Sequence, residues 1–228
     1  MRYFGGKAKI ASKIARFLNN IRVDGQMYVE PFIGSANIAQ YIDEPKYCLD
    51  NCEDLILLWQ DLQKGWKPPN YISEEEYLKL KTDKSSALRA FAGFGCSHSG
   101  KFFGGYAKEG KRNFAEDARK SLQKKLVNLK NTKFECKDYR SLSFNNCLIY
   151  CDPPYRNTCK DFAVKGFDHD EFWSIMRKWS KNNIVIVSEY KAPDDFLCVL
   201  GINTHTCLND PYGIKIPRIE KLFSSNKL

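Results

Sequence analysis

Short strand-like runs alternate with segments of helical periodicity along most of this chain. The runs occupy residues 26–29, 47–49, 134–136, 148–151 and 184–187. Between them, apolar side chains recur at helical spacing, as Leu55, Leu58 and Leu62 do. Strands that alternate with helices form parallel βαβ units, so the sequence predicts an α/β fold.

The same spacing predicts where the helices lie. We expect helices over residues 7–18, 37–42, 53–63, 115–130 and 169–179. A further helix is expected after Ser73, because Ser73 and Glu76 have the spacing of a capping box. Residues 196–223 show a weaker pattern, and we interpret them as a closing antiparallel hairpin.

A proline-containing break divides the chain. Residues 66–70 (WKPPN) interrupt the alternating pattern, and the strand-like runs resume near residue 133. With 228 residues, the chain is long enough for one domain that carries a modest insert. We therefore expect a body formed by residues 1–65 and 133–228, interrupted by an insert over residues 66–132.

The positive charge is concentrated in this insert. Residues 84–133 contain twelve basic and three acidic side chains, which accounts for the whole net charge of +9. A neutral body with one basic segment is typical of a polyanion contact surface, although a lysine-rich face that only aids solubility has the same composition. The candidate phosphate contacts are Lys101, Lys108, Arg112 and Lys124.

Glycines and aromatic residues also gather in the basic segment. They lie in residues 91–95 (FAGFG) and 100–106 (GKFFGGY). Aromatic rings between lysines suit contact with unstacked bases. The alternative is a glycine-rich surface loop that is anchored by buried phenylalanines.

The composition makes several other classes of protein unlikely candidates for this chain. We expect no membrane span, because no run of eighteen apolar residues occurs, and no secretory signal, because the first residues lack an apolar core. The nine cysteines are odd in number and form no Cys-x-x-Cys pair, which indicates reduced thiols in a cytoplasmic protein. The three histidines lack metal-ligand spacing, so we expect no metal.

Polar residues follow the first two predicted strands. Residues 30–34 (EPFIG) form a turn after the first strand, where Gly34 lets the backbone approach a ligand closely. Asp50 follows the second strand, twenty residues after Glu30. An acid at that place accepts hydrogen bonds from the ribose of a nucleoside cofactor, or it caps the following helix, and both interpretations stay open.

The most specific pattern follows the apolar run at 148–151. Asp152, Pro153, Pro154 and Tyr155 form a rigid corner, because the two prolines restrict the backbone. The Asp152 carboxylate and a backbone carbonyl can accept both hydrogens of an exocyclic amine while its ring stacks on Tyr155. The alternative is a Pro-Pro turn that ends a strand, with the aspartate as a cap.

A fourth cluster precedes the first predicted helix. Residues 3–7 (YFGGK) combine two glycines with Lys7 at a helix N-terminus, where a carboxylate can bind. The segment is not a P-loop, because Gly-x-x-x-x-Gly-Lys-Ser/Thr is absent. A flexible terminus with a solvated lysine is the alternative.

Taken in order, these segments resemble one family. The chain is similar to the DNA adenine-N6 methyltransferases of the Dam type, and most closely to the short phage-like members. The matching segments are residues 3–7, 29–37 (VEPFIGSAN), Asp50, 137–140 (KDYR), 152–155 (DPPY) and 184–190 (IVIVSEY). They cover nearly the whole chain, with the insert between the glycine turn and DPPY.

The resemblance implies a Rossmann-like, S-adenosyl-L-methionine-dependent methyltransferase sheet with an inserted target-recognition domain. It implies S-adenosyl-L-methionine as methyl donor, S-adenosyl-L-homocysteine as product, and double-stranded DNA as partner. The cofactor residues carried over from the family are Tyr3, Lys7, Glu30, Pro31, Phe32, Gly34, Asp50, Asp138, Tyr139 and Asp152.

Within that set, the family assigns parts of the cofactor to different segments. The turn at 30–34 cups the methionine part, Asp50 binds the ribose, and Asp138 lies near the adenine. In the catalytic corner, the Asp152 carboxylate and the Pro153 carbonyl hold the target amine, and Tyr155 stacks on the base. We expect site-specific transfer to an adenine flipped out of the duplex, with no metal and no covalent enzyme intermediate.

Two departures from the family are visible. Many members have glycine where Ala36 stands, which predicts a less open turn. The insert is short, so no motif in it indicates a target sequence. We expect a monomer or weak dimer in the cytosol of a bacterium or a phage-infected host, where restriction protection, mismatch marking and phage-genome modification are all compatible roles.

Two other classes of function fit part of the pattern. An amino-methyltransferase acting on RNA adenine, cytosine N4 or a protein glutamine could use a similar pocket, although glutamine enzymes more often have asparagine at the position of Asp152. A DNA-binding module without catalysis, such as an anti-restriction decoy, would not need the corner at 152–155.

Overall fold

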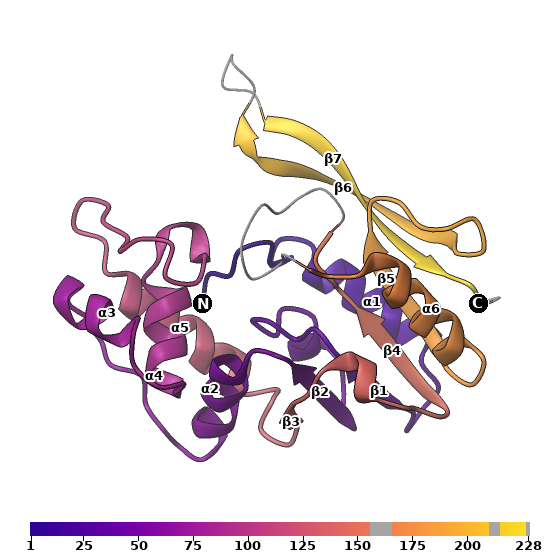
Figure 1. Ribbon diagram of the computed structural model, residues 1–228, viewed down its shortest axis with the longest axis horizontal. Helices are drawn as coiled ribbons and strands as arrows, with labels where there is room; N and C mark the ends of the chain where they lie inside the picture. Colours follow the sequence, from indigo (N-terminus) through magenta and orange to yellow (C-terminus); the bar gives the residue numbers. More distant parts are fainter. Residues whose placement is uncertain (156–165, 210–214, 227–228) are drawn as a thin grey trace.

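The computed structural model describes residues 1–155, 166–209 and 215–226. Seven strands form one sheet in the order β3-β2-β1-β4-β5-β7-β6 (Figure 1). The strands are β1 (Met27–Glu30), β2 (Lys46–Asp50), β3 (Lys133–Cys136), β4 (Cys147–Cys151), β5 (Ile184–Glu189), β6 (Leu197–Asn209) and β7 (Lys215–Ser224). β1 to β5 are parallel, and β7 runs antiparallel to β5 and β6. This arrangement confirms the predicted α/β, Rossmann-like fold and the closing hairpin.

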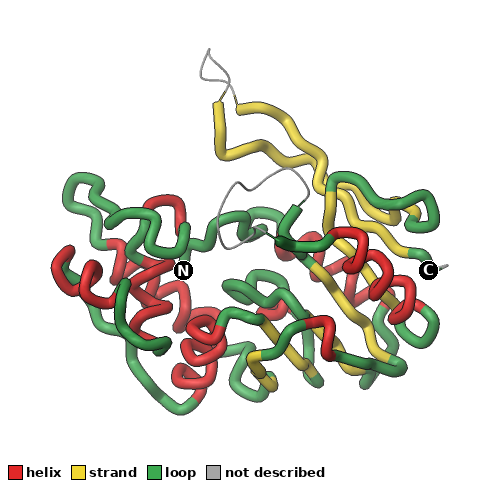
Figure 2. The backbone as a smooth tube through the Cα atoms, in the orientation of Figure 1, coloured by secondary structure: helices red, strands yellow, loops and turns green. Residues whose placement is uncertain are grey.

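Alternation along the strands divides the core into two layers, one on each face of the sheet. Tyr28, Leu148 and Ile186 face α1 (Ala11–Ile21) and α2 (Glu53–Gln63). Val29, Ile149 and Val185 face α6 (His169–Ser180). Because side chains in a strand point alternately to opposite faces, one register buries both sets. Figure 2 shows the strands in yellow and the helices in red.

The predicted helix over residues 37–42 is wrong. Only a short 3-10 turn, η1 (Ala39–Tyr41), forms there. The preceding turn has left-handed backbone angles at Gly34 (φ 47°) and Ala36 (φ 51°), which leaves few residues before β2 begins at Lys46. The Lys46 ammonium donates to the carbonyls of Ala39 and Ile42 at 3.3 and 2.8 Å, so these groups need no longer helix.

The other predicted helices form with shifted ends. α1 begins at Ala11 instead of residue 7, because the Lys7 carbonyl first accepts a turn hydrogen bond from the Ile10 amide. The same helix ends at Ile21 instead of residue 18, and the helix predicted over residues 115–130 extends from Phe114 to Leu126. Helix ends are the least regular part of a periodic pattern, so such shifts leave the topology unchanged.

Residues 66–132 form helices between α2 and β3. They are α3 (Glu74–Leu80), α4 (Ala87–Ala90), the π-helical turn η2 (Phe91–Gly95), the 3-10 turn η3 (His98–Gly100) and α5 (Phe114–Leu126). Ser73 caps α3 by accepting a hydrogen bond from the Glu76 amide at 3.0 Å, as predicted. The magenta helices lie beside the sheet (Figure 1), and their apolar residues join the same buried cluster as α1 and α2.

The aromatic rings of the glycine-rich stretch point inward. Phe91, Phe94 and Phe103 are buried, and Phe102 packs against the same cluster. A Cβ atom on Gly93 would lie 2.5 Å from the Phe102 ring, so this glycine makes room for packed aromatic side chains. The interpretation of these rings as stacking surfaces for bases is therefore wrong, and the alternative with buried phenylalanines holds.

The described residues add two further facts about composition. None of their helices has the length and apolar character needed to cross a membrane. Seven of the cysteines are free thiols, and four of these seven are buried.

Candidate functional site

Acidic and hydroxyl side chains lie on one face of the sheet, at the carboxyl ends of its parallel strands. Glu30, Asp50 and Asp152 end or follow β1, β2 and β4 on the face that packs against α1. Ser188 on β5 and Glu220 on β7 share this face, because each is an even number of residues from a side chain in the α1 layer. The strand order reverses between β1 and β4, which is where open α/β sheets bind ligands.

Lys7 connects the N-terminal segment to this edge. Its Nζ lies 2.8 Å from Asp152 Oδ1 and 3.4 Å from a Glu220 carboxylate oxygen. The side chain of Lys7 is 6% exposed, whereas that of Asp152 is 23% exposed. The predicted corner thus keeps a solvent-accessible carboxylate, and the interpretation of Lys7 as a merely solvated lysine is wrong.

Tyr155 lies against the same lysine. Lys7 Nζ is 4.5 Å from the centre of the Tyr155 ring, and the Tyr155 hydroxyl donates a hydrogen bond to Glu220. Tyr190, just after β5, meets the Tyr155 ring nearly at a right angle with the ring centres 4.8 Å apart. Arg218 donates to the Tyr190 hydroxyl at 2.7 Å, so the contacts continue from the corner to the surface of the β6–β7 hairpin.

The turn after β1 is held by Asp50. The Gly34 amide donates to Asp50 Oδ2 and the Cys52 amide to Asp50 Oδ1, each at 3.0 Å. The residue at the N-cap of α2 is Cys52, so Asp50 does not cap that helix. A carboxylate has about four acceptor positions, so these bonds do not use all of them.

The N-terminal segment packs onto this turn. A Cβ atom on Gly34 would lie 2.9 Å from Cε1 of the Tyr3 ring, and one on Gly6 would lie 2.8 Å from the Asn37 amide nitrogen. Glycine is therefore needed at both positions for the two segments to approach each other. Together with Lys7, these contacts bring residues 3–7, 30–37 and 152–155 into one place.

Burial changes the protonation of the acids in this site. It raises the pKa of Glu30 to about 8, although the Tyr28 hydroxyl, which donates to Glu30 at 2.7 Å, acts in the opposite direction. Burial also raises the pKa of Asp152, against the effect of Lys7. Burial lowers the pKa of Lys7, but Asp152 and Glu220 outweigh it, so the pKa is raised and the ammonium stays charged.

Two of the predicted cofactor residues, Asp138 and Tyr139, follow β3, and only Tyr139 is buried. Tyr139 is buried, and its ring centre lies 5.2 Å from that of Phe32 in the turn. Asp138 accepts a hydrogen bond from the Arg140 amide at 2.9 Å and pairs with the Arg140 side chain at 2.7 Å. The aromatic pair joins the turn to η4 (Tyr139–Ser141), while the carboxylate is partly exposed beside it.

The predicted phosphate contacts are spread over the insert. Lys108 pairs with Glu74 at 2.5 Å, and Arg112 pairs with Glu109 and Asp117 at 3.0 and 2.8 Å. These acids compete with a phosphate for the two cations. Lys101 and Lys124 are exposed, and Lys124 has no acidic partner in the described part of the chain.

Sequence reasoning missed three residues at this site. Glu220 and Arg218 lie on a hairpin whose sequence carries no local motif. Lys125 lies on the buried face of α5, and its Nζ donates to the Ser35 carbonyl at 2.5 Å and to Asn37 Oδ1 at 2.7 Å. Burial lowers the pKa of Lys125 to about 8. The only sequence signal for Lys125 was that a charged residue stands within the apolar stripe of this helix.

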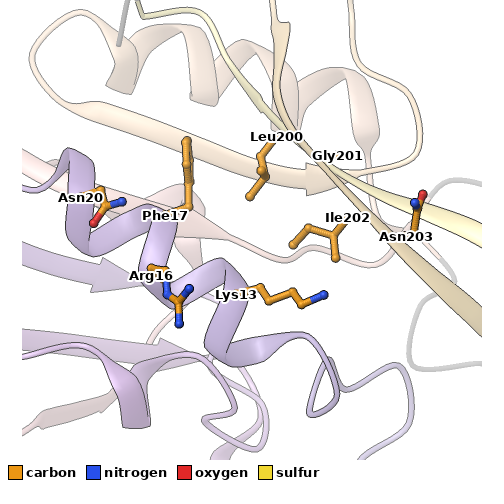
Figure 3. Close-up of a pocket in the computed structure, with 8 residues that line it drawn as sticks. All are labelled: Lys13, Arg16, Phe17, Asn20, Leu200, Gly201, Ile202 and Asn203. Carbon is orange, nitrogen blue, oxygen red and sulfur yellow. The ribbon is translucent and has the colours of Figure 1, made fainter.

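A separate hollow lies between α1 and β6 (Figure 3). It has a volume of about 450 Å³ and is lined by Lys13, Arg16, Phe17, Asn20, Leu200, Gly201, Ile202 and Asn203. It includes none of the predicted site residues. Across the described ranges, no group of three or more histidine, cysteine, aspartate or glutamate side chains could hold a metal ion.

The order of these segments matches a known family. The family model of the D12 class of N6 adenine-specific DNA methyltransferases matches residues 3–92 and 90–193. The chain belongs to this family. The match includes all three segments that meet at the site, and the family's methyl donor is S-adenosyl-L-methionine. The chain is accordingly a methyltransferase, as the resemblance implied.

Comparison with solved structures gives weaker similarity. An rRNA methylase from Streptococcus thermophilus is 11% identical with a TM-score of 0.41, and the alignment covers 97% of this chain and 98% of the other. TehB from Haemophilus influenzae is 9% identical with a TM-score of 0.41, and the alignment covers 96% of this chain and 62% of the other. Similarity at this level carries no information about the substrate. Comparison with curated proteins gave no significant match.

The residues of the site fit S-adenosyl-L-methionine. The turn at 30–37 keeps two left-handed positions, and Asp50 behind it retains free acceptor positions. The Ser35 and Tyr139 hydroxyls are buried and find no hydrogen-bond partner among the described residues, so both remain available to a polar ligand. Carboxylates, buried hydroxyls and a pair of aromatic rings form a donor and acceptor set that suits this cofactor.

Proposed function

We propose that this chain is a site-specific DNA adenine-N6 methyltransferase that acts on an adenine flipped out of duplex DNA in the cytosol of a bacterium or phage-infected cell. One observation carries the proposal. Lys7 Nζ lies 2.8 Å from Asp152 Oδ1, so a segment that packs on the glycine turn also touches the DPPY corner. A cofactor held by the turn and a base held by the corner would therefore be neighbours.

In this proposal, Asp152 and the Pro153 carbonyl accept the two N–H groups of the target amine. Lys7 favours the ionised form of Asp152, which can only accept hydrogen bonds. Two acceptors on one amine leave the nitrogen lone pair free to face the electrophilic methyl group. They also stabilise the positive charge that develops on this nitrogen during transfer.

S-adenosyl-L-methionine, when bound, supplies an electrophilic methyl group on a sulfonium. The chain's own residues bind and orient it. We assign the methionine part to residues 30–34 with Tyr3, and the ribose to Asp50. Phe32 and Tyr139, whose rings are 5.2 Å apart, provide an apolar wall, with Asp138 at its edge.

Tyr155 is assigned to stacking on the extruded base. Flipping a base costs a few kcal/mol, and stacking on an aromatic ring returns about 1–3 kcal/mol. The Tyr155 hydroxyl bonds to Glu220 and its ring contacts Lys7 and Tyr190, so the ring is fixed before the base arrives. A fixed ring loses less entropy on binding than a mobile one.

The basic insert is assigned to the DNA backbone. Lys101, Lys108, Arg112 and Lys124 lie on the same connected segment beside the sheet. Phosphate contacts position a protein on the duplex without reading its sequence. They therefore support binding to DNA while leaving the recognition sequence unassigned.

The test is labelled methyl transfer to matched substrates. Purified protein and labelled S-adenosyl-L-methionine are mixed with duplex DNA, single-stranded DNA, RNA of the same sequence, and total protein. We expect label in duplex DNA, at least tenfold above RNA. Label confined to RNA or protein would overturn the DNA assignment, and cofactor binding without transfer would favour a non-catalytic module.

A further inference from the structure

Glu220 is a buried acid at the centre of the candidate site. It is 5% exposed, and its partners come from three other segments. The Ser188 hydroxyl donates to Glu220 Oε1 at 2.7 Å, the Tyr155 hydroxyl donates to the same oxygen, and Lys7 Nζ lies 3.4 Å from it. No role for this residue follows from the family motifs in the sequence.

The sheet order explains how β7 delivers this acid. β7 pairs antiparallel with β5, and Ser188 lies opposite Leu222. Glu220 is two residues from Leu222, so it is the diagonal neighbour of Ser188 on the same face. Because β7 runs antiparallel, its early residues lie at the carboxyl end of the parallel strands, next to Asp152.

We infer that Glu220 is a positioning residue for methyl transfer, holding the Tyr155 ring in place and giving Lys7 a second carboxylate when the target amine binds Asp152. The inference rests on the proposed function, and it deepens the assignment of the same site. Glu220 touches neither the base nor the methyl group in this account, so it acts through its neighbours.

The need for a second carboxylate follows from the geometry. Lys7 has one ammonium between two acids, at 2.8 Å from Asp152 and 3.4 Å from Glu220. An amine N–H that binds Asp152 Oδ1 competes with Lys7 for that oxygen. A buried ammonium left without a partner is costly, whereas a short move toward Glu220 keeps it paired.

Several titratable groups interact electrostatically with Asp152 or Glu220. They are Tyr3 and Lys7 from the N-terminal segment, Glu30 from β1, and Tyr150, Cys151 and Tyr155 around β4. Glu220 and Asp152 also interact with each other, and the negative charge of Glu220 raises the pKa of Asp152. Removing that charge is therefore expected to lower the pKa of Asp152.

The test compares Glu220→Gln with Asp195→Asn in the full chain. Glutamine keeps the size and an acceptor for the Tyr155 hydroxyl but loses the charge. Asp195→Asn removes an equal charge at an exposed pair with Arg177, away from the site. We expect Glu220→Gln to lower kcat on duplex DNA by about 10- to 100-fold, a typical cost of small misplacement. The Kd for S-adenosyl-L-methionine stays within about twofold, and the acidic limb of kcat/KM moves to lower pH.

A second variant keeps the inference testable if Glu220→Gln fails to fold. Ser188→Ala removes one hydrogen bond to Glu220 without changing charge, so it should lower kcat by a smaller factor and leave the acidic limb in place. The inference is overturned if Glu220→Gln keeps the wild-type kcat and acidic limb, or if Asp195→Asn reproduces its effects. Absence of DNA methylation by the wild-type protein would instead contradict the proposed function itself.

Discussion

At the residue scale, the glycine turn has one position that only glycine tolerates. Gly34 combines a left-handed φ of 47° with a Tyr3 ring 2.9 Å from where a Cβ atom would lie. Gly25 has a similar φ of 69° but open space around it. The two positions therefore share a left-handed backbone, which would strain any other residue, and differ in the contact.

Gly34→Ala should weaken S-adenosyl-L-methionine binding by at least tenfold, because the Tyr3 ring must move out of the turn. Gly25→Ala is the matched control, and it should cost only the strain, about 1 kcal/mol of unfolding free energy, with unchanged cofactor affinity. Calorimetric titration and thermal unfolding measure both quantities. Equal cofactor affinity in the two variants would show that the turn does not hold the cofactor.

Ala36 is the residue-scale departure from the family. Its φ of 51° is unfavourable for alanine, and its side chain is fully buried. Ala36→Gly relieves this strain at the expense of a more flexible unfolded chain, so we expect a melting temperature equal to or slightly above that of the wild type. A clear drop in melting temperature would mean that the buried methyl group contributes more than the strain costs.

At the element scale, residues 84–133, nearly all of which belong to the insert, carry all the excess positive charge, and the insert lies beside the sheet. Lys101 and Lys124 are exposed cations on separate parts of it. If both contact phosphates, Lys101→Gln combined with Lys124→Gln should reduce the slope of log K against log salt by about 2. Lys178→Gln combined with Lys181→Gln, at the end of α6, is the control with the same change in charge. An identical slope in the two double variants would place the DNA elsewhere.

The elements also show what the sequence could predict. The strands and most helices follow from local periodicity, so they were predicted with shifts at the ends. Only the turn η1 forms where a helix was predicted over residues 37–42, because the left-handed turn at Gly34 and Ala36 leaves few residues before β2. The rings at 91–103 turned inward because tertiary packing decides the direction of an aromatic side chain, which composition does not reveal.

The candidate site likewise contains residues that the sequence could predict and residues that it could not. Asp50, Asp152 and Tyr155 lie in or beside motifs that a reader can find along the chain. Glu220 and Lys125 reach the site only through the order of the strands and the docking of α5, which bring together residues far apart in sequence. An isolated acid or lysine in a periodic segment carries no such information.

At the scale of the whole molecule, buried charge links folding to pH. Burial raises the pKa of Glu30 to about 8, whereas in the unfolded chain it ionises near its usual value. Between these values the folded state binds the extra proton, so this group's contribution to stability falls as pH rises toward 8. Lys125, whose pKa burial lowers to about 8, is charged in both states below that pH, so its own pH dependence begins only above it.

Glu30→Gln should therefore flatten the fall in stability between pH 5 and pH 8. The amide can still accept the hydrogen bond from the Tyr28 hydroxyl, so the packing is retained. Urea midpoints of the cofactor-free wild type and variant, measured across this range, give the difference. A variant whose stability falls as steeply as the wild type would place the titration on another group.

The central claim is that the corner at Asp152 holds an adenine amine for methyl transfer. The most direct test is mass spectrometry of nucleosides from DNA of cells that express the wild type or Asp152→Ala. We predict N6-methyldeoxyadenosine with the wild type and at least a hundredfold less with the variant, while purified Asp152→Ala still binds duplex DNA. N6-methyldeoxyadenosine at comparable levels in both, or none with a folded wild type, would contradict the account.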